Sequence, residues 1–199
     1  MKRVWSIFLV AALVCGTLSG CGRIADADTN TIFIEKKGVI EEVTVGEFSG
    51  SNYDLEEFKS FVEENIQSYE VSGAGGKVSL EKATEINETV KLVMSYDSYR
   101  TYTDFVGSTL YVGTVVQAMA DGYDFEAAFH RAAEDNDANV DKKEILSHDG
   151  YNVAVVSVLL DVHVDGTIVY VSDGVTVKNK NTATVENTGE SGCAYIVYK

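Results

Sequence analysis

The sequence predicts an α+β fold in which antiparallel β-sheets pack with one well-defined amphipathic helix and several shorter helices. Segments rich in Val, Ile, Thr and Tyr are separated by Gly, Asn or Asp, which is typical of antiparallel strands joined by turns. One stretch, residues 54–69, changes to the spacing of a helical face. Because no internal repeat and no second composition boundary follows residue 31, residues 31–199 are expected to form a single globular α+β domain.

The predicted domain begins with a β-hairpin and continues into the main helix. Residues 31–36 and 39–48 are rich in Ile, Val, Phe and Thr, and residues 37–38 between them are expected to form the turn. Asp54, with Glu57 three residues later, resembles a capping box at the start of the helix. The apolar residues expected on its buried face are Leu55, Phe58, Phe61, Val62, Ile66 and Tyr69.

A second hairpin is expected after the glycine-rich residues 72–76. Residues 78–86 and 90–96 alternate apolar and polar side chains around a turn at residues 87–88. A strand at residues 110–116 is then preceded by a short helix or 3₁₀ segment. That segment is inferred from four aromatic residues at every third position, Tyr96, Tyr99, Tyr102 and Phe105.

Toward the C-terminus the sequence predicts one more short helix and then mainly strands. Residues 151–164 are nearly continuous in apolar β formers, as expected for a strand buried on both faces. A hairpin turn at residues 165–166 would place residues 167–172 antiparallel to that strand, and residues 173–174 would form another turn. The short helix is expected after Asp124, from the spacing of Phe125, Phe129 and Ala132.

The N-terminal segment is typical of an export signal. Lys2 and Arg3 precede an apolar run over residues 4–15, which is too short to span a bilayer that needs about 20 residues. The segment ends in an aliphatic residue, two small residues and a cysteine. This ending resembles the lipobox of bacterial lipoproteins, with the residues Leu18, Ser19, Gly20 and Cys21.

The lipoprotein resemblance implies that the Cys21 thiol receives a diacylglyceryl group and that a dedicated peptidase cuts just before it. Residues 1–20 would then be the signal peptide and residues 21–30 a tether. The protein is expected at the cell membrane, held by acyl chains on its extracytoplasmic face. A plain secretory signal or an uncleaved anchor are the alternatives. Cys193 would be the remaining thiol of the mature chain, and it is expected in a buried strand.

The charge balance excludes nucleic acid as a partner. The chain holds 31 Asp and Glu against 16 Lys and Arg, for a net charge of −15. Phosphate neutralisation needs clustered basic residues, and the sequence has none. Loss of Lys2 and Arg3 with the signal peptide would change the net charge to −17. An anionic bilayer surface should therefore repel the domain.

Two stretches of the domain resemble uncharacterised lipoproteins of anaerobic Gram-positive gut bacteria. They are residues 113–125 (GTVVQAMADGYDF) and residues 168–177 (IVYVSDGVTV), which follow the predicted hairpin and main helix in the same order. The resemblance brings no known activity, substrate or catalytic residue. It agrees with the location that the lipobox implies.

The candidate metal ligands are four alternating oxygen-bearing residues, Asp135, Asp137, Asn139 and Asp141. Calcium loops use ligands at such alternating positions, and Glu144 follows closely. However, Val140 stands where an EF-hand needs Gly, and Leu146 stands where it needs a bidentate Glu. We therefore expect no cofactor and at most a weak calcium site, with a solvated acidic loop as the alternative.

The candidate partner surface is formed by Tyr96, Tyr99 and Tyr102, in a region that also contains Tyr111 and Tyr123. Tyrosines can stack on sugars or contribute to a protein-binding patch. The alternative is that they are half-buried core or rim residues.

No catalytic motif is complete in the sequence. Ser79 and Lys82 have the SxxK spacing of serine acyl transferases, but a β pattern would place them on opposite faces. The three histidines lack the spacing of a zinc site. Three functional classes stay open, and whether the protein is an enzyme is not decided.

The first class, which the sequence favours, is a non-catalytic, lipid-anchored module that binds an unknown protein or ligand in the cell envelope. The second is an extracytoplasmic hydrolase that uses carboxylates distant in sequence. The third is an envelope assembly factor, which would expose a large apolar patch.

Overall fold

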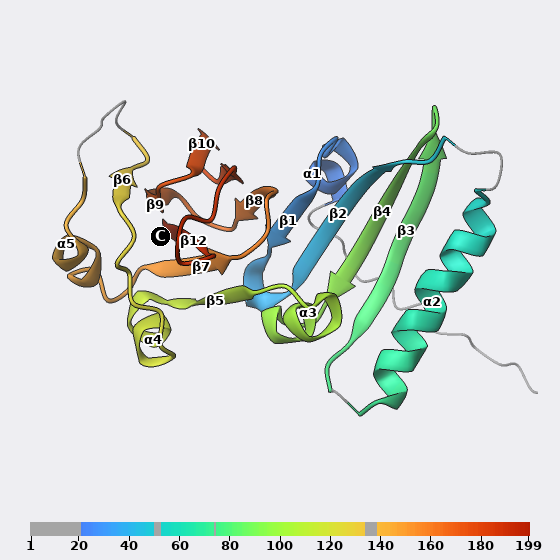
Figure 1. Ribbon diagram of the computed structural model, residues 1–199, viewed down its shortest axis with the longest axis horizontal. Coiled ribbons are helices and arrows are strands. Elements are labelled where there is room, and N and C mark those ends of the chain that lie inside the picture. Colours follow the sequence, from blue (N-terminus) through green and yellow to red (C-terminus); the bar gives the residue numbers. More distant parts are fainter. Residues whose placement is uncertain (1–20, 50–52, 74, 134–138) are drawn as a thin grey trace, which may run out of the picture.

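The computed structural model describes residues 21–49, 53–73, 75–133 and 139–199, and it contains two β-sheets with helices packed around them (Figure 1). The two sheets are rich in antiparallel pairs and combine with five α-helices. The predicted α+β fold class is therefore confirmed.

The larger sheet has seven strands in the order β10-β11-β8-β1-β2-β4-β3. Neighbouring strands are antiparallel except β1 and β8, which are parallel. The bounds of these strands are β1 Thr31–Ile34, β2 Ile40–Glu47, β3 Val78–Ile86, β4 Thr89–Tyr96, β8 Asp161–Val164, β10 Val175–Asn179 and β11 Thr182–Val185.

The smaller sheet has five strands in the order β5-β7-β12-β9-β6, and every pair is antiparallel. Its central strand β12, close to the C-terminus, is buried along its whole length. The bounds are β5 Leu110–Thr114, β6 Phe129–Arg131, β7 Asn152–Val156, β9 Ile168–Ser172 and β12 Ala194–Tyr198.

Helices α2, α3, α4 and α5 begin where polar side chains cap free backbone N–H groups. Asp54 accepts from the backbone N–H groups of Glu56 and Glu57, and Thr114 forms a complete capping box with Gln117. The bounds of the helices are α1 Cys21–Asp26, α2 Leu55–Val71, α3 Tyr99–Val106, α4 Val115–Ala120 and α5 Lys142–Leu146, with a 3₁₀ turn, η1, at Lys36–Gly38.

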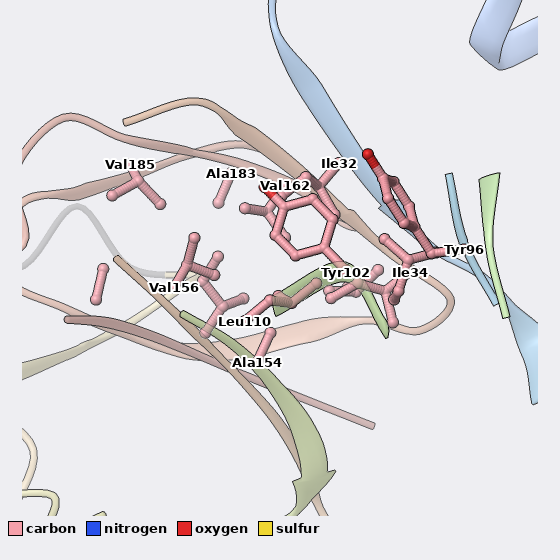
Figure 2. Close-up of a cluster of buried hydrophobic side chains, with 14 of the residues drawn as sticks. Ile32, Ile34, Tyr96, Tyr102, Leu110, Ala154, Val156, Val162, Ala183 and Val185 are labelled. Atoms are coloured by element: carbon pink, nitrogen blue, oxygen red, sulfur yellow. The ribbon is translucent and has the colours of Figure 1, made fainter. Parts of the chain in front are cut away.

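The main core lies between the two sheets, as Figure 2 shows. Successive side chains of a strand point to opposite faces, and this decides which residues belong to the main core. Ile32 and Ile34 of β1 point into this core, whereas Phe33 between them belongs to a small cluster on the outer face. Strand β7 behaves likewise, because Ala154 and Val156 join the main core while its other valines join a second cluster under α4 and α5. Each sheet is therefore covered on both faces over part of its width.

Several predicted elements are confirmed. Both N-terminal hairpins form, β1–β2 around residues 36–38 and β3–β4 around Asn87 and Glu88. The main helix runs over the predicted stretch and begins after Asp54. Of the aromatic segment, Tyr99, Tyr102 and Phe105 lie in the short helix α3, whereas Tyr96 ends β4. The strand expected at residues 110–116 ends at Thr114, where α4 begins instead.

The single strand predicted at residues 151–164 is wrong, because the chain breaks there and changes sheet. Residues 152–156 form β7 of the five-stranded sheet, and residues 161–164 form β8 of the seven-stranded sheet. Both pieces are buried on both faces, which is why the apolar pattern runs on without interruption.

The hairpin predicted at residues 165–166 is also wrong. Strand β9 pairs with β12 and β6 rather than with β8, so Asp165 and Gly166 connect the two sheets. The N–H of Asp165 donates to the Ile34 carbonyl in one sheet, and the N–H of Thr167 donates to the Lys199 carbonyl beyond the other. A Cβ at Gly166 would lie 2.8 Å from that Lys199 oxygen, so glycine serves close approach here and not a hairpin.

The helix predicted after Asp124 is wrong as well. Phe125 has φ 54°, a left-handed conformation that a regular right-handed helix does not contain. Phe129 lies in β6, which pairs with β9. The spacing of Phe125 and Phe129 instead reflects their common burial in the second core cluster, with ring centroids 6.0 Å apart.

The stretch expected as a tether, residues 21–30, contains α1 packed on the outer face of the larger sheet. Ile24 is buried there against Phe33, Val43 and Val93. The Lys91 ammonium donates to the Ala25 carbonyl across the same contact. This part of the chain is therefore an ordered attachment to the sheet.

The turn between β3 and β4 offers a direct test of backbone strain. Asn87 and Glu88 have φ values of 50° and 60°, the left-handed pair that a type I′ turn requires. Glycine adopts this conformation without the Cβ clash, so Glu88→Gly should stabilise the protein by about 1 kcal/mol in urea unfolding. Glu85→Gly, in an exposed position of β3, should instead destabilise it; equal effects of the two changes would contradict the strain argument.

Candidate functional site

A groove of about 500 Å³ lies between α2 and the inner face of the larger sheet. It forms at the edge of that sheet, where β2, β4 and β3 extend beside α2 (Figure 1). The side chains that line it are mostly apolar, and they come from β2, α2, β4 and α3. They are Glu42, Thr44, Phe61, Val62, Asn65, Tyr69, Leu92, Met94, Tyr96, Phe105 and Val106.

The groove exists because α2 covers the sheet incompletely. Val62 is the buried residue of this 17-residue helix, whereas Phe61 beside it is 62% exposed. Phe58 and Ile66 are half-buried against the main core. Apolar surface on α2 and on the sheet thus remains open, and apolar surface left in water favours binding of a second apolar group.

Glu42 lies at the base of the groove, opposite Met94 in the β2–β4 register. Its carboxylate accepts two hydrogen bonds, from the Tyr96 hydroxyl at 2.9 Å and from the Tyr102 hydroxyl at 3.4 Å. Burial raises the pKa of Glu42 above the ordinary carboxyl range, although the two hydrogen bonds oppose this shift. Burial and the neighbouring carboxylate also raise the pKa values of both tyrosines, so they remain neutral donors.

Two other carboxylates have partners of opposite charge. Asp161 accepts from the Lys178 ammonium at 2.7 Å and from two threonine hydroxyls, and these bonds lower its pKa even though burial acts in the opposite direction. Glu144 accepts from the Tyr170 hydroxyl and from the Arg131 guanidinium, which lower its pKa. Glu42 has no such basic partner among the interactions of the described residues.

The three candidate surface tyrosines do not share one exposed patch. Tyr96 and Tyr102 are each 1% exposed and pack edge to face in the main core, with ring centroids 5.1 Å apart. Tyr99 is half-buried and contacts Tyr111, which in turn contacts Tyr123. The structure thus gives Tyr96 and Tyr102 a different position, as hydrogen-bond donors behind the groove.

The candidate calcium ligands can be followed only in part, because Asp135 and Asp137 lie outside the described residues. Asn139 is exposed. Asp141 caps α5 by accepting from the backbone N–H of Lys143 at 2.8 Å. Within the described ranges, no group of three or more His, Cys, Asp or Glu side chains is arranged to hold a metal ion.

The lipobox residues Leu18, Ser19 and Gly20 also lie outside the described residues, and Cys21 is the first residue of α1. None of the helices described is both long and apolar enough to cross a bilayer. The expectation of a buried strand position for Cys193 is wrong: this free thiol is half-buried and lies directly before β12, and burial raises its pKa.

Comparison with protein-family models, curated proteins and solved structures finds no match. The function must therefore be inferred from the chain's own geometry. Within that geometry, the groove over Glu42 combines an open apolar surface with a half-buried charge.

Glu42 is not predicted from the sequence as a site residue, because the pattern of β2 does not mark it. Ile40, Glu42 and Thr44 share one face of the strand, whereas Glu41, Val43 and Val45 share the other. Each face mixes apolar and polar residues, so alternation does not mark one of them as the core face. No local signal in the sequence therefore marks Glu42 as a groove residue.

The raised pKa of Glu42 predicts a pH-dependent loss of stability. The folded protein holds this proton more tightly than the unfolded chain, whose carboxyl titrates near 4.5, so stability falls as the pH rises from there through the folded pKa. Glu42→Gln keeps an acceptor for the tyrosines and removes the charge. We expect it to be more stable than the wild type at pH 7.5, with the difference shrinking as the pH falls and vanishing toward pH 4.

Thermal unfolding across pH 4–8 measures this effect, and Glu85→Gln is a matched control for loss of one exposed negative charge. If the difference in stability between Glu42→Gln and the wild type were the same at every pH, ionisation of Glu42 would not be its cause.

Proposed function

We propose that this protein is a lipid-anchored, extracytoplasmic module that binds an amphipathic ligand in the groove between α2 and the larger sheet, without chemistry on that ligand. The observation behind this proposal is the groove itself, an apolar surface of about 500 Å³ with Glu42 at its base. Ligand sites are commonly of this size, largely apolar with a few polar groups that fix orientation.

The anchor is supported by the lipobox resemblance that ends at Cys21. Because α1 begins at this residue and packs on the larger sheet through Ile24, lipidation of Cys21 would hold the domain close to the bilayer. Two or three acyl chains exceed the marginal hold of a single chain, so release would be slow. The acidic chain would be repelled from an anionic membrane surface, which leaves the domain accessible to a ligand.

Binding is favoured over hydrolysis by the composition of the groove. Two-carboxylate mechanisms require a pair of carboxyl groups about 5–9.5 Å apart, one on each side of the reacting bond. Glu42 is the carboxylate among the described lining residues. The proposal needs no cofactor, and for residues 135–141 we expect a solvated acidic loop that binds calcium weakly at most.

The anchor is tested by Cys21→Ser. This change removes the thiol to which the lipid would be attached, so the variant should accumulate as an uncut precursor without acyl chains. Phase partition in a cloud-point detergent, with labelled fatty acid in the growth medium, measures both properties. Cys193→Ser is the matched control and should partition like the wild type; acylated, mature Cys21→Ser protein would overturn the anchor.

Groove binding is tested with N-phenyl-1-naphthylamine, a neutral apolar dye whose fluorescence rises on leaving water. Phe61→Ala removes an exposed ring from the groove wall and should weaken dye binding about fivefold, the equivalent of about 1 kcal/mol of apolar contact. Val71→Ala, on the same helix but outside the groove lining, should leave dye affinity unchanged. Equal dye affinity in Phe61→Ala and the wild type would contradict binding in this groove.

A further inference from the structure

We infer that the ligand of this groove is an organic cation, with an ammonium or guanidinium group that pairs with Glu42 and an apolar body that lies along α2. This inference rests on the proposed binding function and names the class of ligand. It follows from the charge, hydrogen bonding and aromatic surroundings of Glu42.

The carboxylate of Glu42 lies among apolar side chains without a positive charge to compensate it. No lining residue of the groove is basic within the described chain. The effects on its pKa are burial, which dominates, and hydrogen bonds from two neutral hydroxyls. A half-buried charge without a counter-charge is costly, and a cationic ligand would recover part of that cost.

The tyrosine hydroxyls around Glu42 and at the Tyr69 end of the groove donate within the protein. Tyr96 and Tyr102 each donate their one hydroxyl proton to Glu42, and the Tyr69 hydroxyl donates to the Gly75 carbonyl at 2.8 Å. Each Glu42 oxygen thus accepts one bond from a tyrosine and has a second lone pair available. The base of the groove offers acceptors, so a ligand there must bring donors.

The aromatic rings favour a cation over a neutral donor. Phe105 and Tyr69 are half-buried and line the groove, with ring centroids 5.4 Å apart. Ring faces attract cations, most strongly where water is excluded. A carboxylate beside aromatic rings is therefore suited to an alkylammonium or guanidinium group.

The overall negative charge of the chain also favours a cationic ligand. The full chain has a net charge of −15, and the acidic residues of α2 include Glu63, Glu64 and Glu70, all exposed. An acidic surface repels carboxylates and phosphates and raises the local concentration of cations. Fatty acids and other anionic amphiphiles are therefore disfavoured as ligands.

The test compares n-hexylammonium, hexan-1-ol and hexanoate, which share one apolar chain and differ in the head group. Amide and methyl chemical shifts of the isotope-labelled chain from Cys21 to Lys199, which retains all of α1, report binding at Val62, Leu92 and Met94. At pH 7.5 we expect hexylammonium to bind at least tenfold more tightly than hexan-1-ol, and hexanoate to bind least. Glu42→Gln should abolish the preference for the ammonium, whereas Glu85→Gln should preserve it.

A second measurement uses the wild type alone. Hexylammonium affinity should fall as the pH drops below the raised pKa of Glu42, while hexan-1-ol affinity should stay constant.

Each other outcome overturns a defined part of the argument. Equal affinities for hexylammonium and hexan-1-ol, with shifts at the groove, would overturn the cation inference and leave the binding function standing. If the preference for hexylammonium survives in Glu42→Gln, or is lost equally in Glu85→Gln, overall charge causes that preference. Either result would overturn the role of Glu42. Absence of groove shifts with all three compounds would overturn both the inference and the proposed site.

Discussion

The larger sheet has an inner face that two different elements must cover. The five-stranded sheet covers the part of it formed by β8, β11 and β1, where the main core collects side chains from both sheets. At the β2–β4–β3 edge the cover is α2, a helix narrower than the sheet beneath it. A single amphipathic helix has one apolar stripe, which is too narrow to cover this part of the sheet. The groove is the part of the sheet that stays uncovered.

This incomplete cover explains why a charged residue can occupy an inward-facing position. Glu42 shares a strand face with Ile40, which is fully buried, yet its carboxylate reaches the groove and the hydroxyls of Tyr96 and Tyr102. Two hydrogen bonds only partly offset burial of the charge, as the raised pKa shows. A half-buried carboxylate at the base of an open groove, with no basic partner among the described residues, is more easily understood through a binding role than through folding.

Helix α1 connects the proposed anchor at Cys21 to the same sheet. Ile24 fills the outer cluster with Phe33, and the Arg23 guanidinium contacts both Glu35 and the buried His163. Burial and the nearby Arg23 lower the pKa of His163, which favours the neutral imidazole as an acceptor for that guanidinium. The N-terminal helix is thus bound on one face of the larger sheet, while the groove lies on the opposite face.

Local chemistry in the sequence was sufficient to predict the elements whose partners are close in the chain. The β3–β4 hairpin, the Asp54 cap and the aromatic helix α3 depend on turns, caps and spacing within a few residues, and these were predicted. The lipobox is likewise a local pattern, which is why the anchor could be proposed from the sequence.

Only the tertiary structure decided how the strands divide between the sheets and which side chains form the groove. Parallel pairing of β1 with β8 joins residues about 130 positions apart, and β7 and β8 belong to different sheets despite one continuous apolar pattern. Period-two alternation tells which side chains share a face of a strand, but it carries no information on which strand lies beside it. Glu42, Tyr96 and Tyr102 meet for the same reason: their contacts follow from strand order and helix placement, which depend on packing across the whole chain.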